Sequence, residues 1–359
     1  MPRKRVITPA QALYVGPTPA TGSHVSGVEQ IHRAQTVNYD FTLNRENVSQ
    51  LGQLAPIDRV QVQAPEVSLD FSYLVTDVAN EEKLGFSVNG GISCLSGILA
   101  KTEDEKNYFV LVAPEGTDAN GSATAPTNGS VVGIGNGFIG SYSTEGAVGS
   151  FPTANVSVEA LNIRAYGSGI DVPIPAVNPV NGQAIGGVNF TIPAAVSGNV
   201  AQATALQAGD ITLSLGSSAL LTDTADLAIQ SYNLSFDLSR ESLEKLGSKY
   251  AFTKEINFPI DVSMSVEALM SDLATGSLNN LVCNDDSYDM TVTLRKPSCA
   301  GNGDVAVQYE IKGAKLDSQS WSSSIGPAQT VSLNWTAQLG GPEDTLNGLF
   351  ISGIREADY

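Results

Sequence analysis

The chain has 359 residues and a formal net charge of −18, with 42% hydrophobic and 16% charged residues. This composition is typical of a folded protein long enough for two domains, each with its own core. A strongly acidic surface repels phosphate groups, which excludes sequence-specific binding of DNA or RNA. Long stretches of alternating apolar and polar residues, punctuated by 35 glycines, favour antiparallel β-sheet with many turns.

At the start of the chain we expect neither a secretory leader nor a membrane anchor, because no apolar run approaches about 18 residues. The three cysteines, Cys94, Cys283 and Cys299, are odd in number and match no metal-site spacing. They are interpreted as reduced thiols of a protein made in the cytoplasm.

The first regular elements begin near residue 36. Alternation from Thr36 to Leu43 predicts a strand. Asn44 is then a suitable N-cap, Val48 and Leu51 share one helical face, and Gly52 suits a helix end, so residues 44–52 predict a short helix.

A long strand is predicted next, from Glu66 to Tyr73. Its valine, leucine, phenylalanine and tyrosine alternate with Glu66, Ser68, Asp70 and Ser72. One face is therefore apolar and the other polar and acidic, as expected for a sheet with one solvated side.

Three segments resemble ligand sites but lack the required context. Residues 135–140 fit the spacing of a dinucleotide fingerprint, yet no helix follows, so they are interpreted as a glycine-rich loop. Residues 284–289 are acidic but lack the glycine and glutamate of a calcium loop. The pair Glu66 and Asp70 is unlike a glycosidase pair, because the same pattern recurs later in the chain.

Catalysis has little support, because the only histidines are His24 and His32, near the start of the chain. We therefore expect no enzymatic activity, no cofactor and no metal.

The chain repeats itself at a constant shift. Residues 41–52 share six identities with residues 236–247, including the Arg–Glu pairs Arg45–Glu46 and Arg240–Glu241. The alternating strand recurs at 261–267, where Asp261 and Glu267 lie on the polar face. Later matches keep the same order, with drifting spacing.

These matches predict two copies of one antiparallel β-sandwich or half-barrel, each with a short flanking helix. The predicted units are an N-terminal arm (1–29), copy 1 (30–165), a Pro/Gly-rich connecting segment or insertion (166–225), copy 2 (226–340) and a C-terminal arm (341–359).

The repeated block, Phe-x-Leu-x-Arg-Glu followed by Val/Leu-x-x-Leu-Gly, resembles the tail tube (major tail) proteins of long-tailed phages. The stretches 311–326, 330–339 and 347–353 add to this resemblance. It implies a virion protein whose sheets join between subunits into stacked rings around a DNA channel. Two copies in one chain resemble the duplicated siphophage type, which implies a homotrimeric ring of pseudo-sixfold symmetry.

The resemblance also implies partners: the tape measure protein and DNA in the lumen, and tail terminator and tail-tip proteins at the ends, with no membrane. Glu66, Asp70, Asp261 and Glu267 are the candidates for lining the lumen, or else they face outer solvent or an interface. Arg45, Glu46, Arg240 and Glu241 form either inter-subunit salt bridges or exposed pairs at a helix end. The basic residues 3–5 either reach a neighbouring ring or belong to a frayed terminus.

A second hypothesis from a different class remains, a β-rich surface adhesin or glycan-binding decoration protein. A concave cluster of aromatic residues would favour it, whereas the aromatic residues here amount to 7% and are scattered.

Overall fold

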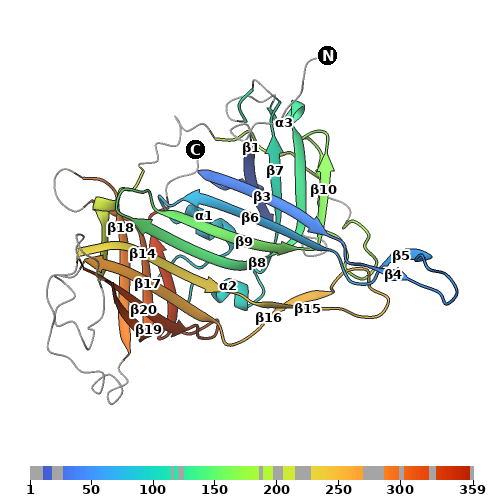
Figure 1. The fold of residues 1–359 in the computed structure, drawn as a ribbon. Coiled ribbons are helices and arrows are strands. Elements are labelled where there is room, and N and C mark those ends of the chain that lie inside the picture. Colours follow the sequence, from blue (N-terminus) through green and yellow to red (C-terminus); the bar gives the residue numbers. More distant parts are fainter. Residues whose placement is uncertain are drawn as a thin grey trace.

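The computed structural model describes residues 11–17, 27–114, 117–119, 125–185, 189–196, 205–214, 228–269, 287–298, 303–322 and 329–355. The prediction of a mainly β protein is confirmed, because most strands join one antiparallel sheet of 15 strands (Figure 1). Within these residues, no helix is long and apolar enough to cross a membrane.

The elements up to residue 190 are the following: β1 (Gln11–Pro17), β2 (Glu29–Gln30), β3 (Ala34–Thr42), β4 (Arg45–Val48), β5 (Asp58–Gln61), β6 (Glu66–Leu74), α1 (Ala79–Leu84), α2 (Ser96–Leu99), β7 (Glu105–Val112), α3 (Ala125–Asn128), β8 (Ser130–Ala147), β9 (Thr153–Ala160), β10 (Asn162–Tyr166), β11 (Val172–Pro173) and β12 (Asn189–Phe190).

The later elements are the following: the 3-10 helix η2 (Ala208–Asp210), β13 (Ile211–Ser214), β14 (Ala228–Asp237), β15 (Arg240–Leu243), β16 (Thr253–Ile256), β17 (Asp261–Leu269), β18 (Tyr288–Arg295), β19 (Val305–Ser322), β20 (Thr330–Gln338) and β21 (Gly348–Gly353).

The two longest strands, β8 and β19, change partners along their length. The first half of β8 pairs with β7 and β10, and its second half pairs with β9 and β14. The first half of β19 likewise pairs with β18 and β21, and its second half pairs with β20. The front of the molecule is therefore one continuous run of strands in the order β3-β6-β9-β8-β14-β17-β20-β19 (Figure 1).

The predicted alternation of β6 and β17 is confirmed by burial. Val67, Leu69, Phe71 and Tyr73 are buried on one face of β6, and Val262, Met264 and Val266 are buried on the same side of β17. The helices α1 and α2 pack behind the sheet and close a single large core over this face (Figure 1). Strands that alternate apolar and polar residues in this way bury one face against the core and expose the other to solvent.

The predicted helix at 44–52 is wrong, and so is the flanking helix predicted for copy 2, which by the shift of the repeat falls at residues 239–247. Both segments begin β-hairpins, formed by β4 with β5 and by β15 with β16. Gly52 and Gly247 have positive φ, but they lie in the hairpin loops and not after a helix. Val48 and Leu51 are exposed, so no packing stabilises one helical turn, and pairing with a neighbouring strand satisfies the backbone instead.

The glycine-rich loop predicted at 135–140 is also wrong, because these residues lie inside β8. The glycines allow another segment to cross the strand closely. A Cβ atom on Gly135 would lie 2.4 Å from the Ala176 nitrogen. Asn136, at a positive φ of 53°, fixes the crossing, because its Oδ1 accepts a hydrogen bond from the Val177 nitrogen at 2.8 Å.

This crossing segment, residues 172–177, belongs to the stretch 166–225 that the sequence left unplaced. Its described residues form a second apolar cluster behind β1, β7 and β8, including Ile174, Phe190 and Ile192. Aromatic contact between Phe109 and Phe190, with ring centroids 5.6 Å apart, joins the cluster to β7. The segment thus covers the back of the first part of β8.

Both ends that the sequence assigned to arms contain strands of the sheet. β1, within 1–29, pairs with β7 along its whole length, and β21, within 341–359, pairs with β19. Leu13 and Ile351 are fully buried in the core, which explains their ordered positions. The basic residues 3–5 lie outside the described part of the chain.

Candidate functional site: a polar sheet face with two open edges

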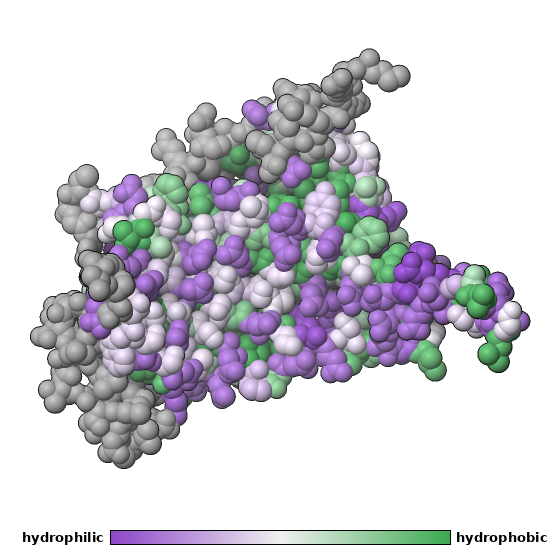
Figure 2. Space-filling model, in the orientation of Figure 1, coloured by the Kyte–Doolittle hydropathy of each residue, from purple (hydrophilic) through white to green (hydrophobic). Residues whose placement is uncertain are grey.

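The side of the continuous sheet that faces away from the core, called here the polar face, is built mainly of serine, threonine and asparagine. Across the strands these residues meet as partners, for example Ser72 with Asn155, Ser143 with Ser235, and Ser263 with Thr336. Figure 2 shows this side, where hydrophilic and neutral colours predominate over the sheet. The face offers many weak hydrogen-bonding groups and a scatter of carboxylates.

All four candidate lumen residues lie on this face. Glu66 and Asp70 project from β6, and Asp261 and Glu267 from β17, and all are exposed. The structure thus brings carboxylates from β6 and β17, which lie far apart in the sequence, onto one surface.

The two ends of the continuous sheet are unpaired edges among the described residues, called here the open edges. One is β3, which pairs with β6 only, and the other is residues 315–322 of β19, which pair with β20 only. Each edge carries large apolar side chains on its core-facing side that solvent reaches: Tyr39 and Phe41 on β3, and Trp321 on β19. Unpaired edges with exposed apolar groups are templates for pairing with another chain.

Inside the molecule, the first and second parts of the sheet meet where residues 141–147 of β8 pair with residues 231–237 of β14, called here the internal seam. Phe236 stacks on Tyr142 across it, with ring centroids 5.5 Å apart. The seam is fully packed, because Leu234 and Leu238 are completely buried.

Arg240 fastens the internal seam from the start of β15. Its Nη2 lies 2.6 Å from Asp104 Oδ1, its Nε donates to the Ile139 carbonyl at 2.9 Å, and its guanidinium lies over the Phe138 ring. The Arg240 side chain is fully buried, so a bidentate pair with a carboxylate is needed to offset its desolvation.

This arrangement corrects the interpretation of the repeated Arg–Glu pairs. Arg240 neither pairs with Glu241 nor reaches another subunit, because it is held inside the chain. Arg45, Glu46 and Glu241 are exposed on the two hairpins, and no helix end is present there for them to stabilise. The equivalent arginines thus have opposite surroundings, one buried and one exposed.

A buried carboxylate lies behind the seam. Glu81 of α1 accepts hydrogen bonds at Oε1 from the hydroxyls of Tyr73, at 2.8 Å, and Tyr142, at 3.0 Å. The Tyr142 hydroxyl also lies 3.1 Å from that of Tyr309 on β19, which connects the cluster to the second part of the sheet. Burial raises the pKa of Glu81 to about 7 and raises the pKa of the three tyrosines.

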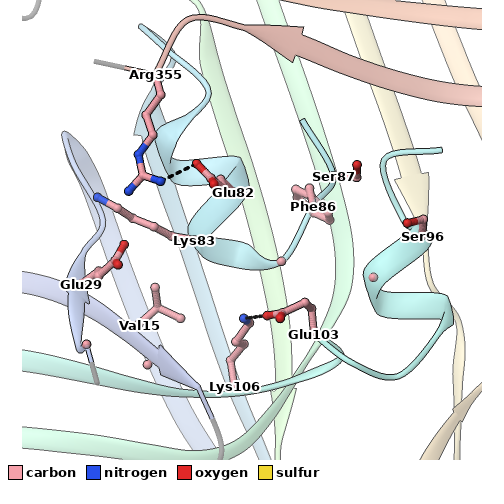
Figure 3. Close-up of a pocket in the computed structure, with 14 residues that line it drawn as sticks. Val15, Glu29, Glu82, Lys83, Phe86, Ser87, Ser96, Glu103, Lys106 and Arg355 are labelled. Atoms are coloured by element: carbon pink, nitrogen blue, oxygen red, sulfur yellow. Dashed lines mark hydrogen bonds and ion pairs between the residues drawn. The ribbon is translucent and has the colours of Figure 1, made fainter. Parts of the chain in front are cut away.

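A separate pocket of about 530 Å³ opens behind the sheet, between β1, α1 and α2 (Figure 3). Two ion pairs lie among its lining residues: Arg355 lies 2.8 Å from Glu82, and Lys106 pairs with Glu103. No histidine or cysteine is among its lining residues. The Arg355–Glu82 pair connects the residues after β21 to α1, and we assign the pocket a structural role.

The remaining chemical candidates form no site in the described part of the chain. Cys94 is buried, which raises its thiol pKa, and the His32 backbone nitrogen donates to Asn80. No group of three or more potential metal ligands occurs among the described residues. His24, Cys283, Cys299 and residues 284–286 lie outside them.

The sequence does not predict the open edges or the Arg240–Asp104 pair. For the edges, the only sequence signal is the aromatic content of residues 39–41 within the predicted strand 36–43. Asp104 lies 136 positions before Arg240, and no local pattern connects the two.

No known protein family model matches the chain, and no curated protein sequence matches it.

Proposed function

We propose that this chain is the structural subunit of a phage tail tube. In this proposal, chains join head to tail through the open edges, close into rings and stack into a tube that conducts the genome. The observation that carries the proposal is the continuous sheet with one polar face and two open edges. A sheet of this kind loses its edges when several chains close into a cylinder.

The proposal includes two copies of one unit in the chain, supported by strand pairing. Phe41 pairs with Val67 in β3–β6, and Phe236 pairs with Val262 in β14–β17, so both partners move by the shift of the sequence repeat. A bulge interrupts both strand pairs at equivalent positions. The extra residue is Gln35 in one and Gln230 in the other, and each amide donates to the carbonyl two positions earlier.

The equivalence extends through the hairpins and the long strands. Arg45 pairs with Gln61 as Arg240 pairs with Ile256. β1 borders β7 as β13 borders β18, and β10 borders β8 as β21 borders β19. On this basis the copies comprise residues 11–166 and 211–353, wider than the sequence repeat indicated, each a half-barrel of four front strands.

The ring is proposed to contain three chains, each supplying two equivalent units, which gives pseudo-sixfold symmetry. The polar face lines the lumen, where Glu66, Asp70, Asp261 and Glu267 repel DNA phosphates and the rows of serine side chains carry no charge. The tape measure protein occupies the lumen before DNA passes, and tail terminator and tip proteins close the ends. The protein acts in the virion and is made in the host cytoplasm.

The test is electron microscopy of the purified protein together with native mass spectrometry. We expect rings or tubes with an open centre, and ring masses of three chains. Rings of six chains would overturn the trimer. Dispersed monomers that bind glycans on an array would replace the tube by the adhesin hypothesis.

A further inference from the structure

The continuous run of strands consists of two sets of four, β3-β6-β9-β8 and β14-β17-β20-β19. The internal seam is the contact between the last strand of the first set, β8, and the first strand of the second set, β14. The strands of the open edges correspond to the strands of this seam. β3 corresponds to β14 at the shift of the sequence repeat, because Phe41 pairs with Val67 as Phe236 pairs with Val262.

The second half of β19 corresponds in the same way to the second half of β8. Val158 of β9 is equivalent to Trp335 of β20, since each pairs with an equivalent residue of β6 or β17. Ile139 pairs with Val158 as Leu316 pairs with Trp335, and a bulge follows each of these pairs. These matches align the two strands residue by residue.

Burial at equivalent positions shows what the open edge lacks. Leu234, Phe236 and Leu238 in the seam are 0%, 3% and 0% exposed. The equivalent residues at the open edge, Tyr39, Phe41 and Leu43, are 36%, 59% and 38% exposed. All six side chains face the core from their own strands. The difference in exposure therefore comes from the neighbouring strand, which β8 supplies in the seam and which β3 lacks.

We propose that β3 of one chain pairs with residues 318–322 of β19 of a second copy, in the register of the internal seam. This inference rests on the proposed tube function and specifies its inter-chain contact.

In this register, the seam pairs Leu234–Thr144 and Phe236–Tyr142 correspond to the inter-chain pairs Tyr39–Trp321 and Phe41–Gln319. The half-exposed Trp321 thereby acquires an aromatic partner in Tyr39.

The same register assigns a role to Arg45. Arg240 donates to the carbonyl of Ile139, and Leu238 donates its backbone nitrogen to the carbonyl of Gly140 at 2.6 Å. The equivalent inter-chain bonds run from Arg45 to the carbonyl of Leu316 and from the Leu43 nitrogen to the carbonyl of Asp317. Arg45 therefore inserts into the neighbouring chain, where it is a positioning contact for the hairpin.

Hydrogen bonds at both ends of the seam fix which pairs lie close together. The Leu238 nitrogen donates to the Gly140 carbonyl, and the Val148 nitrogen donates to the Gln230 carbonyl at 2.9 Å. Counting from either end, the pairs on the polar face are the non-hydrogen-bonded kind, whose Cα atoms are about 4.5 Å apart. That separation lies within the range of a disulfide.

Disulfide trapping tests the register with four positions used in two combinations. In a chain whose native cysteines are replaced by serine, the in-register pairs are Asn38→Cys with Ser322→Cys, and Thr42→Cys with Ser318→Cys. The matched controls exchange partners, Asn38→Cys with Ser318→Cys and Thr42→Cys with Ser322→Cys. Exchange displaces the sulfurs by about 13 Å along the strand, beyond disulfide reach.

After mild oxidation, we expect covalent species up to the trimer from the in-register pairs and only monomer from the exchanged pairs. Rings seen by electron microscopy with trapping only in the exchanged pairs, or in neither, would overturn the register and leave the tube function standing. The absence of rings from the cysteine-free parent and from the unmodified chain would overturn both.

Substitution of Arg45 tests its contact separately. Arg45→Ala is expected to raise the protein concentration needed for half-maximal ring formation about tenfold or more, as for loss of a charge-assisted contact. Arg59→Ala, which removes the same charge from the partner strand of the hairpin, is expected to change it less than about twofold. Equal effects of the two substitutions would reject the specific role of Arg45.

Discussion

At the scale of single residues, the buried cluster around Glu81 joins the two parts of the sheet through three tyrosine hydroxyls. Burial raises the pKa of this carboxyl from 4.5 to about 7. Between these two pH values, the folded protein therefore keeps a proton that the unfolded chain releases. The contribution to stability is therefore fully present below about pH 4.5 and is lost as the pH rises towards 7.

We predict that Glu81→Gln stabilises the protein at pH 8 and changes its stability little at pH 4.5. A shift of this size corresponds to at most about 3 kcal/mol in the free energy of unfolding. Urea denaturation of both proteins at the two pH values measures the difference. Glu66→Gln, on the exposed polar face, is the control and should follow the wild type; equal effects at both pH values would reject the assignment.

Arg240 offers a second residue-scale test. Arg240→Ala leaves Asp104 almost buried without its partner, and we expect a loss of about 3–5 kcal/mol in the free energy of unfolding. Arg45→Ala, at the equivalent exposed position, should leave the stability of the isolated chain within about 0.5 kcal/mol. Chemical denaturation below the assembly concentration compares them, and a similar loss in both variants would contradict the distinction.

At the scale of elements, the glycines of β8 let residues 172–177 cross the back of the strand. We predict that Gly135→Ala lowers the stability by about 1–3 kcal/mol, because the added methyl would overlap the backbone of Pro175 and Ala176. Gly140→Ala is the control, since its nearest contact would be 3.7 Å. Thermal unfolding and limited proteolysis near residue 175 measure the effect, and equal loss in both variants would argue against the crossing contact.

The elements that the sequence predicted well are those whose burial alternates along the chain. β6 and β17 follow this rule, because one face packs on the core and the other is wet. The hairpin β4–β5 does not: Val48 and Leu51 mimic a helical face, yet they are exposed. The glycines of β8 imitate a loop, because the residues that require them lie in a later segment, 172–177.

The candidate site was also predictable only in part. The carboxylates of the polar face could be grouped from the sequence, because the segments that form β6 and β17 have the same alternation. The internal seam could not be predicted, because it depends on β8 and β14 becoming neighbours across a long intervening segment.

At the scale of the whole molecule, the polar face carries carboxylates over two parts of one sheet. We predict that replacing Glu66, Asp70, Asp261 and Glu267 by lysine yields assemblies that retain duplex DNA. Released counterions make each lysine–phosphate contact favourable, so retention should weaken steeply with salt. Co-sedimentation of DNA with the assemblies measures it; glutamine and asparagine at these positions are the control and should retain none. DNA binding by both sets, or by neither, would contradict a lumen-facing position.

The internal seam also has a consequence for assembly. In the proposed ring of three chains, both strands of each internal seam belong to one polypeptide, so half of the edge contacts around the ring form during folding, at any dilution. Three contacts between chains then remain, and the equilibrium concentration of rings rises with the third power of the chain concentration, where six separate units would give the sixth power. Covalent tethering of this kind acts as a high effective concentration, so the proposed ring should form at protein concentrations that would be too low for six separate units.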